Sequence, residues 1–182
     1  MPFILEAMME RQLAIWAVSE KGAPGIIIGG GGALESAKLW PDILGHGAGW
    51  PPFFVSEHVI RSLDRAGIPY ARLTKMPVAE VNPARLQSAP PDYYVLEADQ
   101  GIAVDYAASG VPVDREGKPI PHLYPRKVAR KFDLNSWTGA DLFSSPNIWK
   151  RPTCSLMCTE RIVELAKADS WSNVKFEPIS VV

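Results

Sequence analysis

Apolar and polar positions follow the same pattern in two separate stretches of the chain. Each stretch has three apolar residues, a hydroxyl residue and a glutamate, followed by apolar positions at helical spacing and a short alternating segment. The first covers Phe53–Leu63 and Tyr70–Leu73, and the second covers Leu156–Ala166 and Asn173–Phe176. This pattern predicts a strand, a capped helix and a second strand in each stretch.

The predicted helices have matching start signals. Ser56 and Thr159 stand at the two starts, where a hydroxyl can accept a hydrogen bond from an unpaired backbone N–H one turn on. Glu57 and Glu160 follow, and their charge suits the positive end of a helix. Gly67 predicts the end of the first helix, because glycine tolerates the left-handed backbone found there.

Further apolar segments predict additional strands around these two units. They are Leu13–Val18, Gly25–Ile28, Tyr93–Leu96, Ile102–Val104, Lys127–Leu134 and Val174–Ile179. We expect Ile102–Val104 to pair with Tyr93–Leu96. The proline-containing stretches 74–92 and 107–125 predict connections, the first with a short helical turn at Pro83–Gln87.

The repeated unit is larger if Asp141–Phe143, which mirrors Asp42–Leu44, belongs to it. We therefore predict one α+β domain with a mixed or antiparallel sheet and two related strand–helix–strand units. It would comprise N-terminal strands in residues 1–39, a first half in 40–92 and a second half in 93–182.

Composition narrows the possible partners. The chain has 182 residues, 47% of them apolar, which is enough for one packed core. The net charge of −1 favours neither nucleic acid nor a membrane surface as a partner. The sequence has no signal-like start and no apolar stretch of about 20 residues, so we expect a cytoplasmic protein. We expect it to be a monomer or a small homo-oligomer.

Motifs for cofactors and metals are incomplete. Leu34 stands where a dinucleotide-binding loop would place its third glycine after the run Gly29–Gly32, so this run predicts a flexible turn. Cys154 and Cys158 are four residues apart, which fits no paired zinc motif. Cys158 matches Val55 in the repeat and is expected to pack as a small apolar residue. We expect no cofactor and no metal.

Reactive side chains also form no recognised catalytic motif. His46, His58 and His122 have no metal-binding spacing between them. Ser56, Glu57 and His58 are consecutive, and neighbouring positions of a helix do not face each other. We therefore predict no catalytic residue and no enzyme activity. The alternatives are a small hydrolase-like enzyme that uses the region of Asp42 and His46, or a scaffold or adaptor domain.

Charge is segregated along one part of the chain. Residues 92–116 carry six acids opposed only by Arg115, whereas residues 118–131 carry five bases and no acid. Two solvated loops explain this pattern, and so does a contact surface that steers a basic partner. The acids are Asp92, Glu97, Asp99, Asp105, Asp114 and Glu116.

Four segments and a closing Phe-x-Pro strand at Phe176–Pro178 carry a resemblance to a known family. The four segments are Phe54–Glu57, Tyr93–Leu96, Asp141–Phe143 and Cys158–Arg161. Through them the chain resembles the eleventh numbered immunity-protein family of bacterial polymorphic toxin systems. The resemblance covers the chain from Trp40 onward. A related myxobacterial group carries two CxxCG zinc motifs, and this chain has neither.

This resemblance implies a protein without enzyme activity that binds a cognate toxin and neutralises it in the producing cell. The toxin would be a secreted antibacterial protein, such as one delivered by a contact-dependent type VI secretion system. Aromatic anchors in the proline-rich loops would join the acidic residues as toxin contacts. They are Trp50, Tyr124, Trp137 and Trp149.

Overall fold

The computed structural model describes residues 4–9, 15–18, 24–28, 40–45, 53–76, 78–81, 89–120, 123, 130–144 and 156–181. Two helices, α1 (Glu57–Arg65) and α2 (Glu160–Ala168), and a set of short strands form the fold. The strands are β1 (Ile4–Met9), β2 (Ile15–Val18), β3 (Pro24–Ile28), β4 (Ile43–Gly45), β5 (Phe53–Ser56), β6 (Arg72–Met76), β7 (Val78–Val81), β8 (Tyr93–Glu97), β9 (Ala103–Val104), β10 (Lys131–Asp133), β11 (Leu142–Ser144), β12 (Leu156–Thr159), β13 (Val174–Pro178) and β14 (Ser180–Val181).

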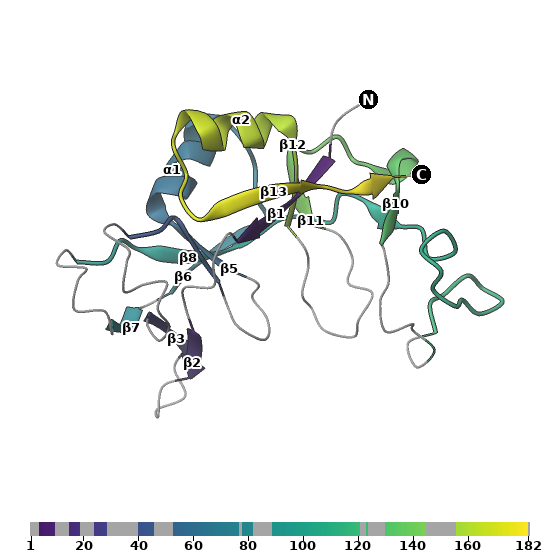
Figure 1. The fold of residues 1–182 in the computed structure, drawn as a ribbon, viewed down its shortest axis with the longest axis horizontal. Coiled ribbons are helices and arrows are strands. Elements are labelled where there is room, and N and C mark those ends of the chain that lie inside the picture. The colour runs from purple at the N-terminus through teal and green to yellow at the C-terminus, as the bar shows by residue number, and fades with distance from the viewer. Residues whose placement is uncertain are drawn as a thin grey trace.

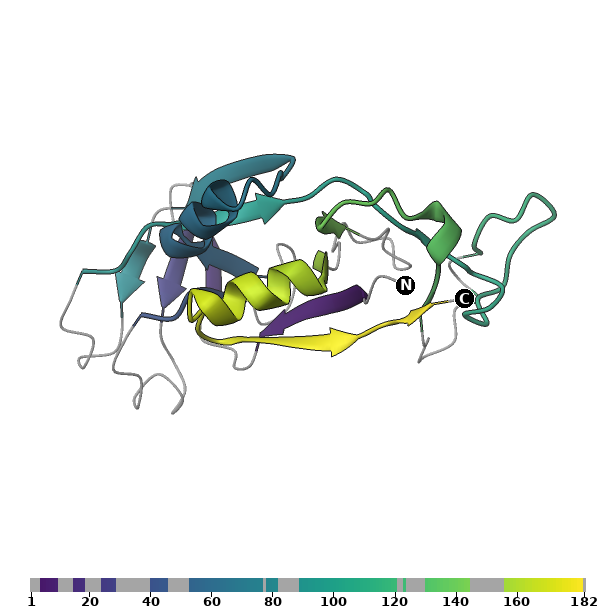
Figure 2. The same ribbon diagram turned by 90° about the horizontal axis from the view of Figure 1, so that it is seen from above.

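The strands form four sheets. Two are four-stranded and antiparallel, with the orders β4-β5-β8-β6 and β11-β12-β1-β13. Two are three-stranded and mixed, with the orders β2-β3-β7 and β14-β10-β9. Figures 1 and 2 show α1 and α2 near each other beside the four-stranded sheets, with the smaller sheets at opposite ends of the molecule. No helix in the described part of the chain is long and apolar enough to cross a membrane.

The predicted α+β class and its two related units are confirmed. The first unit consists of β4, β5, α1 and β6, and the second of β11, β12, α2 and β13. Both helices have nine residues and follow directly on a strand. Ser56 caps α1 by accepting a hydrogen bond from the Val59 N–H, and Gly67 ends it at a φ of +65°. Figure 1 shows the helix of each unit leading back into a strand.

Each four-stranded sheet contains one inner strand from outside its unit. In the first sheet β8 lies between β5 and β6, and in the second β1 lies between β12 and β13. The registers of these two strands are equivalent: Val55 pairs with Tyr94 as Cys158 pairs with Leu5. At their other edges, β8 pairs with β6 and β1 pairs with β13, again in equivalent registers. The pairs there are Arg72 with Glu97 and Lys175 with Met8.

The duplication therefore extends beyond the two predicted units. Each repeat begins with one strand, β1 or β8, and continues through β4 to β6 or through β11 to β13. The first strand of each repeat lies in the sheet of the other repeat.

The main apolar core lies between the two units. Buried residues at equivalent positions of the two units meet in one cluster, to which both helices and both sheets contribute. The equivalent pairs are Ile43 with Leu142, Val55 with Cys158, and Val59 with Ile162. A second cluster around Phe132, Phe143 and Met157 joins the second sheet to β9 and β10. Removing this apolar surface from water is the main favourable contribution to folding.

Three strand predictions need correction. The stretch 74–92 was expected to be a connection, but β6 extends to Met76 and β7 covers Val78–Val81. Pairing of β6 with β8 explains the extension, because cross-strand contacts override local preference. The strand β9 pairs with β10 instead of β8, since β5 and β6 already occupy both edges of β8. The predicted turns at Gly29–Gly32 and Pro83–Gln87 lie outside the described residues.

Candidate functional site

Asp42 is the centre of a polar network in the first unit. It directly precedes β4 and is buried, and its carbonyl oxygen accepts a hydrogen bond of 2.8 Å from the Ser56 N–H. This bond continues the β4–β5 pairing by one residue and holds the Asp42 carboxylate at the N-terminus of α1. A negative charge is stabilised there by the helix dipole and by the unpaired N–H groups of the first turn.

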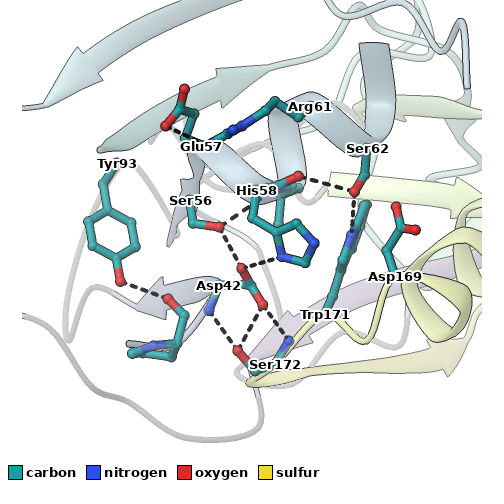
Figure 3. A network of polar contacts seen from close by, with 12 residues as sticks. Asp42, Ser56, Glu57, His58, Arg61, Ser62, Tyr93, Asp169, Trp171 and Ser172 are labelled. Atoms are coloured by element: carbon teal, nitrogen blue, oxygen red, sulfur yellow. Dashed lines mark hydrogen bonds and ion pairs between the residues drawn. The ribbon is translucent and has the colours of Figure 1, made fainter. Parts of the chain in front are cut away.

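The Asp42 carboxylate accepts four hydrogen bonds, which Figure 3 shows. Oδ1 accepts from Ser56 Oγ at 2.6 Å and from His58 Nδ1 at 3.0 Å. Oδ2 accepts from the backbone N–H and the hydroxyl of Ser172, both at 2.9 Å. Ser172 follows α2, so the Asp42 carboxylate joins the two units. Its usual acceptor positions are all in use.

The meeting of Ser56 and His58 corrects the expectation that these neighbours do not converge. Ser56 precedes the helix and His58 lies in its first turn, so both side chains reach the same oxygen of Asp42. The arrangement differs from a catalytic triad, in which the histidine stands between serine and aspartate. Here Ser56 Oγ donates to Asp42 directly and is buried, so it is not available as a nucleophile.

An equivalent network exists in the second unit. Asp141 precedes β11, and its carbonyl oxygen accepts from the Thr159 N–H at 2.9 Å. Thr159 Oγ1 donates to Asp141 Oδ1 at 2.6 Å, and Arg161 donates to Oδ2 at 2.6 Å. Thr159 was expected to cap α2 with its hydroxyl, but that hydroxyl makes no cap hydrogen bond. It lies at the cap position and binds Asp141 instead.

The two networks differ in the basic residue. Arg161 also donates to the Ala66 carbonyl oxygen at the end of α1, at 2.8 Å, so it links the second network to the first helix. His58 makes one side-chain hydrogen bond within the described residues, and half of its side chain is exposed (51%).

An open pocket of about 520 Å³ borders the first network. We name it the His58 pocket. Two prolines, one alanine and one tryptophan form its apolar walls, and its polar part consists of Asp42, His58, Ser170 and Ser172. The apolar residues are Trp40, Pro41, Ala89 and Pro91. Its volume lies in the range of small-molecule pockets.

Tyr93 supports the wall of this pocket from inside the sheet. Its hydroxyl donates to the Pro41 carbonyl oxygen at 2.7 Å, and its side chain is fully buried. Burial, assisted by the nearby Asp42 charge, raises the pKa of Tyr93 far above its ordinary value. The hydroxyl therefore stays protonated and fixes the backbone beside Asp42.

Cys158 belongs to β12 and lies in the apolar core between the two units. It is fully buried and borders a small cavity of about 20 Å³ between the units. Burial raises the pKa of the Cys158 thiol to about 12, which opposes formation of a reactive thiolate. The expectation that Cys158 packs as a small apolar residue is confirmed.

The predicted acidic contacts have local partners in most cases. Asp92 pairs with Lys75, Glu97 with Arg72 through both carboxylate oxygens, and Glu116 with Lys118. Two others accept backbone N–H bonds within turns: Asp105 from residue 108, and Asp114 from residues 116 and 118. Asp99 is exposed and has no ion pair with the described residues.

Of the four predicted aromatic contacts, Trp137 is the one that lies within the described residues. A toxin contact in a loop would be exposed, but Trp137 is partly buried. Its ring packs beside Phe143 with centroids 6.5 Å apart, and its indole N–H donates to the Ala140 carbonyl oxygen. Packing against the second cluster explains this difference. Trp50, Tyr124 and Trp149 lie outside the described residues, as do His46 and His122.

Within the described residues, no three histidine, cysteine or acidic side chains gather in a way that could hold a metal ion. The sequence shows that Asp141 mirrors Asp42, but it does not show that each aspartate is the centre of a hydrogen-bond network. The shared signal is an aspartate followed by two apolar residues, in Asp42–Leu44 and in Asp141–Phe143. Ser172 gave no signal, because its contact with Asp42 spans 130 residues.

No protein-family model matches this chain, and a comparison with curated proteins finds no match.

Proposed function

We propose that this chain is an immunity protein that binds a secreted antibacterial toxin and neutralises it in the producing cell. The observation that carries the proposal is that the motifs resembling that family form one duplicated frame. In this frame Asp42 and Asp141 bind the residues that begin the two helices. Because these polar groups are used within the frame, recognition would fall to the connecting loops, as in many binding proteins.

The acidic residues of the segment 92–116 are the proposed steering surface for a basic toxin. Asp99 is the strongest candidate, because it is exposed and without an ion pair among the described residues. Glu116 is also exposed, and its pairing with Lys118 on the same loop is a surface ion pair of little strength. Asp92 and Glu97 are partly neutralised by β6 and would contribute less. Charges of this kind change association rates more than final affinity.

Co-expression tests the proposal directly. Cells that make a toxin encoded beside this gene should survive when this protein is present and die when it is absent. Equal killing with and without this protein would refute the immunity function.

Charge reversal tests the acidic surface separately. The double variant Asp99→Lys/Glu116→Lys should slow association with the toxin roughly tenfold at low salt, because electrostatic steering is lost. Glu164→Lys, which reverses an exposed acid on α2, is the matched control and should leave the rate unchanged. An unchanged rate and salt dependence in the double variant would remove these acids from the interface while leaving the immunity function intact.

A second candidate, a small hydrolase-like enzyme, is favoured by one observation. His58 accompanies Asp42 at the edge of an open pocket, and an aspartate beside a histidine is a frequent way to orient a general base. Hydrolysis of a p-nitrophenyl ester that disappears in His58→Ala and persists in Arg161→Ala would support this candidate. Equal rates in the two variants would exclude a role of His58 in that reaction.

A further inference from the structure

We propose that the His58 pocket binds a ring that carries a hydroxyl group, such as the phenol of a tyrosine. The inference does not depend on the immunity function. It rests on the hydrogen bonds around Asp42 and on the residues that line the pocket. A phenol in this site would donate a hydrogen bond from its hydroxyl group to His58 Nε2 while its ring packs between the apolar walls.

The hydrogen bonds around Asp42 determine which group of the pocket is free to accept. Each oxygen of the carboxylate accepts two hydrogen bonds. Ser172 Oγ donates to Asp42 Oδ2 and accepts from the Asp42 N–H at 2.8 Å, so this hydroxyl is used in both directions. A carboxylate only accepts, and His58 Nδ1 therefore carries the proton in their shared bond.

This tautomer leaves His58 Nε2 as a lone-pair acceptor. Nε2 has no hydrogen-bond partner among the described residues, and the imidazole lines the pocket. Ser170 adds a hydroxyl at the rim, where residue 170 adopts a φ of +57° after α2. The pocket therefore offers a ligand one oriented acceptor with one hydroxyl nearby.

The charges and walls of the pocket select the class of ligand. An anion would lie close to the Asp42 charge, and a cation would find the oxygens of Asp42 already occupied. A neutral donor avoids both costs. Trp40, Pro41 and Pro91 give the pocket flat apolar walls, which suit an aromatic ring. A ring-borne hydroxyl combines these two properties.

The second unit serves as an internal comparison. Arg161 stands where His58 stands and binds Asp141 as His58 binds Asp42. A guanidinium satisfies the aspartate equally well but has no acceptor to offer a ligand. Histidine in the first unit therefore adds a hydrogen-bond acceptor that stabilising the aspartate does not require.

Nuclear magnetic resonance of the histidine ring nitrogens in the full chain tests the inference. We expect His58 to carry its proton on Nδ1 near neutral pH. The probes are 4-methylphenol and toluene, with N-acetyl-L-tyrosinamide and N-acetyl-L-phenylalaninamide as a second pair. In each pair the hydroxyl compound should bind about three- to tenfold more tightly and shift the His58 resonances, as expected for one neutral hydrogen bond.

The two pairs of probes distinguish the source of the phenol. Binding of N-acetyl-L-tyrosinamide at least as tight as that of 4-methylphenol would assign the site to a tyrosine of a bound protein. Tighter binding of 4-methylphenol would assign it to a small free phenol.

Variants complete the test. His58→Ala should abolish the preference for the hydroxyl compounds, whereas Arg161→Ala, the equivalent change in the second unit, should retain it. Circular dichroism checks that both variants are folded. The inference is overturned if the His58 proton lies on Nε2, if no probe binds, or if the hydroxyl and non-hydroxyl compounds bind equally to the unchanged protein. The tautomer and this ratio decide the question even if a variant fails to fold.

Discussion

Asp42 and Asp141 occupy equivalent positions in the two units, and each accepts a 2.6 Å hydrogen bond from the hydroxyl that precedes a helix. They differ in their surroundings. Asp42 is buried and is also bound by Ser172 from the other unit, whereas Asp141 is partly exposed beside Arg161. The aspartate of the first unit is therefore more deeply buried and has a contact with the other unit through its carboxylate that Asp141 lacks among the hydrogen bonds of the described residues.

Replacing these aspartates should reveal this difference in stability. Asp42→Ala leaves several donors without a partner, and we expect the free energy of unfolding to fall by about 3 kcal/mol. Asp141→Ala should cost about 1 kcal/mol, because the exposed Arg161 can turn to water. Urea denaturation measures both values. A larger loss for Asp141→Ala would contradict the structural ranking.

The residues before the helices should also respond differently. Ser56→Ala removes the cap of α1 and the bond to Asp42, at a cost of about 1–2 kcal/mol. Thr159→Ala removes only the bond to Asp141 and should cost about 1 kcal/mol. Thr159→Ser keeps the hydroxyl and is the control, with little expected change in the thermal unfolding midpoint. Equal losses for Ser56→Ala and Thr159→Ala would argue against the cap at Ser56.

Cys158 predicts weaker stability at alkaline pH. The folded protein holds the pKa of this thiol at about 12, above the ordinary value of 9.0. Above pH 9 the unfolded chain loses the proton and the folded chain retains it, so the free energy of unfolding falls between about pH 9 and pH 12. It should be independent of this thiol below pH 9. Cys158→Val should reduce the slope of unfolding free energy against pH, and an unchanged slope would contradict the buried thiol.

Gly101 should not tolerate a side chain. A Cβ at this position would lie 2.5 Å from the Cβ of Phe143, which is fully buried. Gly101→Ala is therefore expected to lower the free energy of unfolding by about 1–3 kcal/mol through overpacking. Gly110→Ala is the comparison, because its Cβ meets nothing within 4 Å and only its φ of +70° opposes the change. A smaller loss at Gly101 than at Gly110 would show that Phe143 moves aside.

Local patterns were sufficient to predict the two units. The cap at Ser56, the stop at Gly67 and the helical spacing of apolar residues are interactions between near neighbours, so the sequence displays them directly. The strand β1 and the role of Ser172 depend on contacts with residues more than a hundred positions away. No local signal distinguishes such a strand or such a serine from others of similar composition.

The His58 pocket was harder to predict than the fold. Proximity in sequence suggested the region of Asp42 and His46 as an enzyme site, and His46 lies outside the described residues. Among the described residues the histidine partner of Asp42 is His58, which the first turn of α1 brings back toward β4. A residue that begins a helix can reach the strand before it, and helix periodicity alone does not describe this contact.

The position of β1 also affects how the protein folds during synthesis. Leu5 pairs with Cys158, more than 150 residues later in the chain, whereas β8 follows β5 and β6 closely. At about 5–20 residues per second, β1 would wait roughly 8–30 s on the ribosome before its neighbours are made. The first sheet can therefore close while the second is still being translated. During that interval β1 is an unpaired strand, and a chaperone that shields such segments would find its substrate there.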